Sequence, residues 1–403
     1  MPRKYWILLA GIVCIGTLLR IVSLTSNPAG FFTDEAVIGL DALSFITYGT
    51  DHLGNPPSFL IEALGDYRGF VQILTAMPLV HFFGLSETTV RLTSALYGIA
   101  TIGIVFLLTR TLFNSSTALV AALFLSLSPW HVHISRIGWQ NATLAFWFTT
   151  SIYMFILSLK RPILFYLSAA GFGITMYTYF PGRLLSPLML SALLLLYRKE
   201  LRHIHTTRTF WTGLGYFAVF LIPLIIGLVN GQTMARLQLM SVFQQDLSWI
   251  EKLFHITASY MNYFSPMFLF THGDIHFPGQ FITRHSVGGL GELYFMQFPL
   301  IVYGIYYIWK KRTQPPYLLI LIWLLIYPLS GAFTDIQPQA TRGIIGSVMF
   351  QIISAIGLVE IYRWIEKRFA RFQKWFYVGT NRTYPSFSSS FPHTLSKIPT
   401  VFL

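Results

Sequence analysis

The feature that most constrains this chain is a series of apolar runs separated by short polar or basic segments. Several runs, among them 92–108 and 210–229, approach the roughly 20 residues that a helix needs to cross a bilayer. Hydrophobic residues make up 54% of the 403 residues and charged residues only 11%, against about 25% charged in ordinary soluble domains. The sequence therefore predicts an all-α polytopic membrane protein.

The distribution of basic residues predicts how the chain crosses the membrane. A net charge of +13 would suggest a nucleic-acid partner in a soluble protein, but Lys and Arg of membrane proteins collect in cytoplasmic loops. Arg3 and Lys4 place the N-terminus in the cytoplasm, before an apolar run that is too long for a signal peptide and lacks a small-residue cleavage site. We expect no nucleic-acid partner and an integral, multi-pass membrane protein with its N-terminus in the cytoplasm.

About ten transmembrane helices bring every dense basic cluster to the cytoplasmic side. The apolar segment 69–84 is short and contains Pro78, so we interpret it as a helix on the outer membrane surface. A short transmembrane helix is the alternative, and it would invert the topology of everything after it. The expected spans are 5–23, 92–108, 118–130, 142–159, 163–178, 184–196, 210–229, 294–309, 317–333 and 343–361.

This threading divides the chain into a membrane domain and a C-terminal segment. The membrane domain covers 1–362, with a large acidic first external loop at 24–91 and a second large external loop at 230–293. Residues 363–403 form a basic cytoplasmic segment and a tail, which from Val378 is rich in Ser, Pro and Thr and is expected to be disordered.

The acidic residues concentrate in one polar stretch, 31–69, directly after the first apolar run. This stretch holds six of the 15 Asp and Glu residues, and the first helix brings Asp34 and Glu35 to the membrane plane. Because a carboxylate near a bilayer is costly, such a residue is retained for chemistry or ion binding. A carboxylate just outside the membrane can act as a general base, so Asp34 and Glu35 are the candidate catalytic residues.

Further polar groups fall on the same external side. Arginines at the outer helix ends can grip a phosphate, and aromatic residues beside them suit sugar faces or a lipid chain. The alternatives are anchoring of lipid headgroups and an ordinary interfacial belt. His131 and His133 are weak metal candidates, since two imidazoles at this spacing diverge on a helix. The external groups are Asp66, Arg68, His131, His133, Arg136, Tyr177, Tyr179, Arg183 and Arg342, with His272, Asp274, His276, Arg284 and His285 in the second loop.

Several stretches resemble a known family. They are FFTDEA at 31–36, GDYRG at 65–69, the run 84–146, GITMYTYFPGRLLSPL at 173–188 and QATRGIIGSVMFQIISAIGL at 339–358. Over about 1–362 the chain resembles the C-type glycosyltransferase fold. More closely it resembles bacterial members of the dolichyl-phosphate-mannose–protein mannosyltransferase family (glycosyltransferase family 39) and the related aminoarabinose transferases.

The resemblance implies an inverting glycosyltransferase of the bacterial inner membrane that moves a sugar from a polyprenyl-phosphate-linked donor to a protein, lipid or glycan acceptor on the external face. It implies Asp34 as the base or as the residue that orients the acceptor, and Arg183 and Arg342 near the lipid phosphate. A divalent metal ion stays open, because Gln140 and Asn141 stand near where many relatives carry an acidic residue. A transporter or flippase, and an inactive, truncated relative, are the alternatives.

Overall fold

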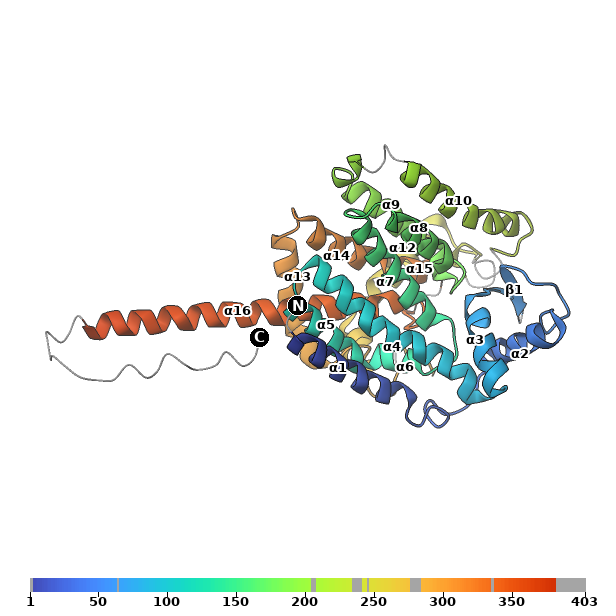
Figure 1. The fold of residues 1–403 in the computed structure, drawn as a ribbon, viewed down its shortest axis with the longest axis horizontal. Helices are drawn as coiled ribbons and strands as arrows, with labels where there is room; N and C mark the ends of the chain where they lie inside the picture. Colours follow the sequence, from blue (N-terminus) through green and yellow to red (C-terminus); the bar gives the residue numbers. More distant parts are fainter. Residues whose placement is uncertain are drawn as a thin grey trace.

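The computed structural model describes residues 3–63, 65–203, 208–233, 241–244, 246–275, 284–334 and 337–381, with the last twelve described by backbone alone. This part of the chain is almost entirely helical and contains a two-stranded antiparallel hairpin (Figure 1). The all-α class predicted from the sequence is confirmed.

The first half of the chain contains most of the elements that surround the site described below. In order they are α1 (Arg3–Ile21), α2 (Thr33–Tyr48), β1 (Leu60–Ala63), β2 (Asp66–Gly69), α3 (Val71–Phe83), α4 (Glu87–Leu112), α5 (Ser115–Leu127), α6 (Pro129–Ser135), α7 (Asn141–Ser158), α8 (Leu164–Thr175) and α9 (Pro181–Leu196).

The second half adds the helices that complete the bundle. They are η1 (Glu200–His203), α10 (Arg208–Val229), η2 (Val242–Gln244), α12 (Trp249–Asn262), η3 (Met267–His272), η4 (Phe295–Gln297), α13 (Phe298–Lys310), α14 (Pro315–Ile326), α15 (Leu329–Ala332) and α16 (Ile344–Asn381).

Each of the ten segments predicted to cross the membrane forms a helix. Within the described residues, five helical stretches are long and apolar enough to span: α1, α4, α10, Pro315–Ala332 and Ile344–Phe369. The pair α5 and α6, bent by 58° at its junction, adds a sixth if it is one broken span. The multi-pass membrane architecture is therefore confirmed, while ten spans stay a prediction because α8 and α9 are only 12 and 16 residues long.

The helices differ in how deeply they lie in the bundle. In α16, 83% of the apolar window is buried, whereas in α10 only 22% is, and Figure 1 shows α10 at the edge of the body. The exposed side chains of α10 include Val219, Ile222 and Ile225. A continuous apolar surface of this kind marks a membrane-facing helix rather than a water-facing one.

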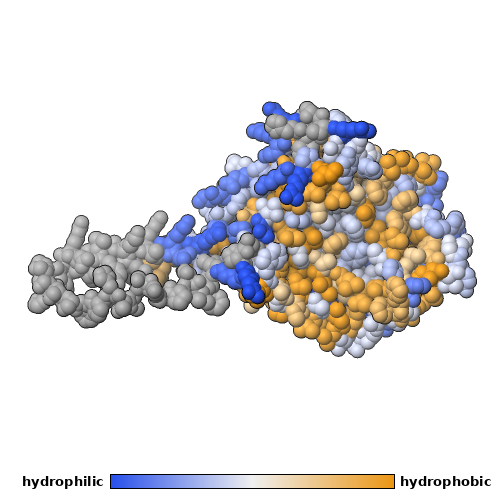
Figure 2. All heavy atoms as spheres, viewed as in Figure 1, coloured by the Kyte–Doolittle hydropathy of each residue, from blue (hydrophilic) through white to orange (hydrophobic). Residues whose placement is uncertain are grey.

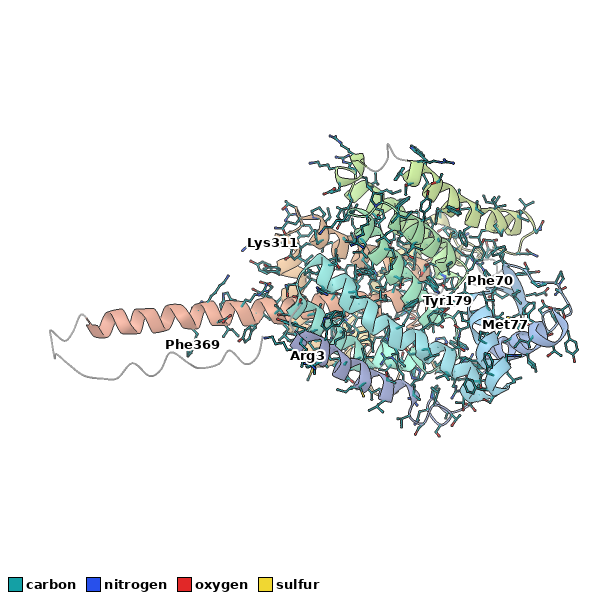
Figure 3. The ribbon with its side chains drawn as sticks, in the orientation of Figure 1. Arg3, Phe70, Met77, Tyr179, Lys311 and Phe369 are labelled. Atoms are coloured by element: carbon teal, nitrogen blue, oxygen red, sulfur yellow. The ribbon has the colours of Figure 1, made fainter. Side chains whose placement is uncertain are left out.

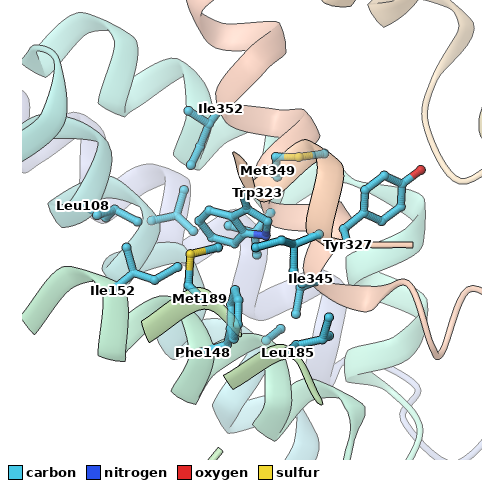
Figure 4. Close-up of a cluster of buried hydrophobic side chains, with 14 of the residues drawn as sticks. Leu108, Phe148, Ile152, Leu185, Met189, Trp323, Tyr327, Ile345, Met349 and Ile352 are labelled. Carbon is cyan, nitrogen blue, oxygen red and sulfur yellow. The ribbon is translucent and has the colours of Figure 1, made fainter. Parts of the chain in front are cut away.

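The core joins helices that are distant in sequence. Trp323 of α14 is fully buried, and its ring lies 5.5 Å from that of Phe148 on α7. Figure 4 shows Leu108 of α4, Met189 of α9 and Met349 of α16 in the same cluster. Close packing of this kind resists displacement, so these helices provide a rigid support for the loops at their ends.

The region 24–91, predicted as a large acidic loop, is mostly folded. It contains α2, the β1–β2 hairpin, α3 and the start of α4. A helical stripe explains this difference: Ile38 and Ala42 of α2 pack against Ile73 and Ala76 of α3. The acidic residues of α2 masked that stripe in the sequence. α3 has 13 residues, well under the roughly 20 of a straight span, and its position on or across the membrane stays a prediction.

The second predicted loop, 230–293, also contains helices, namely η2, α12 and η3. His276 in this loop lies outside the described residues. At the C-terminus, α16 continues through the basic segment to Asn381 as one helix. Of the tail predicted from Val378, only 378–381 are described, and these are helical.

Basic residues such as Arg3 and Lys311 lie at the end of the body from which α16 projects. Figure 3 shows Arg3 and Lys311 at the end from which α16 projects, and Phe70, Met77 and Tyr179 towards the other end. Figure 2 shows hydrophilic residues at the base of α16 and hydrophobic residues over much of the body. This separation is what the positive-inside rule predicts if the end that carries Tyr179 is external.

Candidate active site

A cavity of about 300 Å³ lies in the part of the body away from the projecting end of α16, where Figure 3 labels one of its lining residues, Tyr179. Its walls come from the start of α2, from β2, from the connections α6–α7 and α8–α9, and from the segments before η4 and α16. Both carboxylates and guanidinium groups therefore meet around one polar space. The lining residues are Asp34, Asp66, Tyr67, Arg68, Gly69, Trp139, Gln140, Asn141, Thr178, Tyr179, Phe180, Arg284, His285, Gln339, Thr341 and Arg342.

The start of α2 turns its two acidic residues in different directions. Glu35 accepts a hydrogen bond from the Phe32 N–H at 3.1 Å, which caps the helix. Its carboxylate is fully buried and also accepts from the Gly138 N–H at 2.7 Å and from Arg91. Asp34 lines the cavity, and 37% of its side chain is exposed. The structure therefore brings Asp34 to the cavity and places Glu35 behind it.

Arg68 reaches Asp34 from the hairpin. It stands opposite Ile61 in the β1–β2 register, its Nη2 is ion-paired with the Asp34 carboxylate, and its Nη1 donates to the Asp34 carbonyl at 3.2 Å. The guanidinium thus fixes both the backbone and the side chain of Asp34. The ion pair with Arg68 is made through Oδ1 of that carboxylate, and Asp34 keeps part of its side chain exposed at the cavity.

The hairpin itself is held by a close backbone approach. Gly69 lies against the α8–α9 connection, where a Cβ would come within 1.9 Å of the Tyr177 carbonyl oxygen. The Val71 N–H donates to the same oxygen at 3.3 Å. Arg183 donates to the Tyr67 carbonyl at 2.8 Å and to the Thr233 carbonyl at 3.1 Å. Only glycine fits this contact. Because Arg68 is the residue before Gly69, the position of Arg68 depends on the glycine.

Arg342 enters from the segment before α16. It is 2% exposed, donates to the Thr334 hydroxyl, and its guanidinium carbon lies 5.9 Å from the centre of the Phe180 ring. Asn141 donates to the neighbouring Thr341 carbonyl at 3.2 Å. The α7 start therefore positions this arginine at the cavity wall, where a guanidinium can bind a phosphate or carboxylate in two-point geometry.

Three of the predicted site residues hold backbone rather than lining the cavity. Arg136 donates to the Leu19, Val22, Ser23 and Asn27 carbonyls at 2.7 to 2.9 Å, which ties down the α1–α2 connection. Arg183 clamps the hairpin as described above. The Tyr177 hydroxyl donates to the Phe220 carbonyl at 2.5 Å. Of the predicted site residues, Asp34, Asp66, Arg68, Tyr179 and Arg342 meet at the cavity.

The two candidate metal ligands on α6 face different partners. His131 is buried with Nδ1 2.9 Å from Arg20 Nη2, and His133 Nε2 donates to the Arg284 carbonyl at 2.9 Å. No group of three or more His, Cys, Asp or Glu side chains that could hold a metal ion occurs among the described residues.

Several lining residues were not assigned to the site from the sequence. Trp139 forms an edge-to-face contact with His285, at 5.2 Å between ring centroids. The Arg284 guanidinium lies 4.2 Å from the Phe32 ring centre and 5.7 Å from that of Trp139. Arg284 and His285 stand in the second loop, more than 200 residues from Asp34, and no local motif links them. Only the expectation that both loops share the external side pointed to them.

Comparisons with known proteins find a matching family model and several similar solved structures. The protein-family model described as dolichyl-phosphate-mannose-protein mannosyltransferase matches residues 73–226. No curated protein matches the chain. Among solved structures, ArnT from Cupriavidus metallidurans bound to undecaprenyl phosphate is similar at a TM-score of 0.60 and 15% identity, over 89% of this chain and 60% of that one.

Two structures from Archaeoglobus fulgidus are also similar. The apo oligosaccharyltransferase matches at a TM-score of 0.57 and 15% identity, over 91% of this chain and 52% of that one. AglB in complex with an inhibitory peptide and a dolichol-phosphate matches at 0.57 and 13%, over 96% and 52%. This chain spans between half and three fifths of the length of these proteins. It has the C-type glycosyltransferase fold that the sequence resemblance predicted.

Proposed function

We propose that the chain is a membrane glycosyltransferase that moves a sugar from a polyprenyl-phosphate-linked donor to a protein, lipid or glycan acceptor. The observation that carries the proposal is the meeting of Asp34, Arg68 and Arg342 around one cavity. Undecaprenyl phosphate and dolichol-phosphate are bound in two of the similar structures, which supports a polyprenyl-phosphate donor here.

The roles proposed for the arginines and for Asp34 follow from their charges. Arg342 and Arg284 bind the phosphate of the sugar donor. The negative charge of this phosphate grows as its bond to the sugar breaks, and the two guanidinium groups, already in position, stabilise that charge in the transition state. Asp34 contacts the acceptor hydroxyl or amine on the opposite side of the sugar and orients or deprotonates it. Attack from that side inverts the anomeric centre. The site opens to the external face, as the basic residues at the other end of the molecule support.

The test is sugar transfer in membranes from a panel of radiolabelled polyprenyl-phosphate sugars, comparing the wild type with Asp34→Asn at equal expression. The matched control is Glu360→Gln, because Glu360 is also paired with an arginine, Arg363, but lies about 24 Å along α16 from its start. We expect transfer by the wild type and the control and none by Asp34→Asn. Transfer by Asp34→Asn would remove Asp34 from the mechanism, and solute flux without donor consumption would replace the proposal with a transporter.

A further inference from the structure

A second group of ionisable side chains lies directly behind the cavity wall. Asp274 follows η3, and His285, Ser286 and Glu292 lie in the segment before η4. The backbone brings them together, because the Glu292 and Leu293 N–H groups donate to the Phe268 and Leu269 carbonyls. Asp274 and Glu292 are at most 1% exposed, and His285 is 6% exposed. Of these residues, only His285 lines the cavity.

The hydrogen bonds require a proton on one of the two buried carboxyl groups. Ser286 Oγ contacts both Asp274 Oδ1 and Glu292 Oε1, but a hydroxyl has a single proton to donate. The Asp274 N–H donates to the same Oγ at 3.1 Å. The second carboxyl contact must therefore be donated by a protonated acid. Asp274 Oδ2 accepts from the Ala340 N–H at 3.0 Å, whereas Glu292 Oε2 has no hydrogen-bond partner among the described residues.

This count assigns the proton to Glu292 and leaves Asp274 as the carboxylate. Burial raises the pKa of the Glu292 carboxyl well above its usual range, and the adjacent Asp274 raises it further. The Asp274 carboxylate faces His285, with Asp274 Oδ2 3.5 Å from His285 Nδ1. That Nδ1 is buried and makes no hydrogen bond within the described part of the chain, and the Asp274 carboxylate is the acceptor that the structure places beside it.

We propose that His285 is the proton acceptor of the site, with its Nδ1 proton held by Asp274 and its Nε2 facing the cavity. This inference rests on the proposed function. It assigns to two different residues the two roles proposed above for Asp34, orientation of the acceptor and removal of its proton. Asp34, already paired with Arg68, orients the acceptor, and His285 takes the proton. Asp274 lies beside His285, and His133 of α6 interacts electrostatically with both of them. The charged groups that line the cavity together with His285 are Asp34, Asp66, Arg68, Arg284 and Arg342.

The step balances without any further reactant. The acceptor O–H or N–H bond breaks and its proton passes to His285 Nε2. The released electron pair forms the bond to the anomeric carbon, and the bond from that carbon to the phosphate oxygen breaks. The pair from the second bond leaves with the polyprenyl phosphate. The imidazolium that results is stabilised by Asp274, and an imidazole is the side chain best suited to exchange this proton with water near neutral pH.

Two substitutions separate proton transfer from a structural role. His285→Asn keeps a donor near the Nδ1 position to satisfy Asp274 but has nothing at the Nε2 position. We expect a folded protein whose kcat falls by about 10² to 10⁴-fold with little change in KM. His285→Ala should be partly rescued by added imidazole, whereas Asp34→Asn should not. His81→Asn is the control, since His81 is exposed at the end of α3 and should leave activity unchanged.

A spectroscopic readout tests the arrangement without turnover. In protein labelled with ¹⁵N-histidine, the signal that disappears in His285→Asn should show the tautomer protonated at Nδ1. A neutral His285 protonated at Nε2, or a His285→Asn enzyme with wild-type kcat, would overturn the proposal. If His285→Asn stays active while Asp34→Asn is inactive, the proposed function stands and this inference fails. If the wild type transfers no sugar from any donor, the proposed function fails and the tautomer still decides the pairing of His285.

Discussion

Glu35 and Arg91 form an ion pair from which solvent is wholly excluded, with Arg91 Nε 2.9 Å from Glu35 Oε1. The same guanidinium donates to the Leu24 carbonyl at 2.9 Å and the Pro28 carbonyl at 3.1 Å. The pair therefore joins the start of α2, the connection from α1 and the start of α4. Since Asp34 immediately precedes Glu35 in the sequence, the pair fixes the position from which Asp34 enters the cavity.

Removing one partner of this pair should unfold the region around it. Arg91→Leu leaves the Glu35 carboxylate buried without its cation, which costs about 3 to 5 kcal/mol in comparable pairs. Glu35→Gln keeps an oxygen for the Gly138 N–H and should cost less. Thermal unfolding in detergent measures both. An Arg91→Leu protein as stable as Glu35→Gln would show that the pair does not hold α2.

The acidic pair shows what the sequence could and could not predict. Helix one and the first acidic residues were predictable because the apolar run delivers Asp34 and Glu35 to the membrane plane. Their different roles were not, because the direction of a side chain depends on Arg91, which is 56 residues away from Glu35. Arg136 shows the same limit: an arginine that caps four carbonyl groups and one that binds phosphate look identical in sequence.

The fold, too, was predictable from the sequence only in part. The apolar runs located ten segments that are helical in the structure, because burial or lipid contact of whole helices dominates such a sequence. They missed α2 and the hairpin, whose stabilising partners, Ile73 and the Tyr177 carbonyl, come from other segments. The cavity is made at those junctions. Its lining by Arg284 and His285 depends on long-range packing that no local pattern records.

The protonated Glu292 should make stability depend on pH. Because its pKa is raised above the ordinary 4.5, the folded state keeps a proton that the unfolded state releases. Its contribution is fully present below about pH 4.5 and is lost as pH rises through the raised pKa. The unfolding temperature of the wild type should therefore fall, relative to that of Glu292→Gln, from about pH 5 to about pH 8.

Glu251 is the matched control for this titration. Hydrogen bonds from the Ser248 side chain and backbone lower the pKa of the exposed Glu251 carboxyl, so it is already ionised in both states over this pH range. Glu251→Gln should run parallel to the wild type between these pH values. Parallel curves for Glu292→Gln as well would mean that Glu292 is ionised in the folded protein and would contradict the proton count at Ser286.

The contact between Gly69 and Tyr177 predicts that a substitution outside the proposed catalytic residues displaces Arg68 from the cavity. In Gly69→Ala the new methyl group would overlap the Tyr177 carbonyl, and overpacking of this kind costs about 1 to 3 kcal/mol. The hairpin should move away and carry Arg68 with it, lowering both the unfolding temperature and sugar transfer. Gly103→Ala is the control, because a Cβ at Gly103 meets nothing within 4 Å and alanine favours the helix. Equal behaviour of the two variants would show that the approach does not position β2.

Binding of the lipid phosphate should stabilise the protein through Arg342. A ligand that binds only the folded state at 100 times its Kd adds about 2.7 kcal/mol of stability. Undecaprenyl phosphate should therefore raise the unfolding temperature of the wild type, while undecaprenol, which lacks the phosphate, should not. Arg342→Gln should abolish the phosphate-dependent part of the shift.

A second arginine distinguishes this site from general lipid binding. Arg312 is exposed and stacks over Trp309 at the opposite, basic end of the protein, where a phosphate headgroup could also be attracted. Arg312→Gln should keep the full shift with undecaprenyl phosphate, because that arginine does not line the cavity. If the shift is lost in Arg312→Gln and kept in Arg342→Gln, the phosphate binds at the basic end. The cavity that Asp34 and Arg342 share would then have to recognise a different ligand.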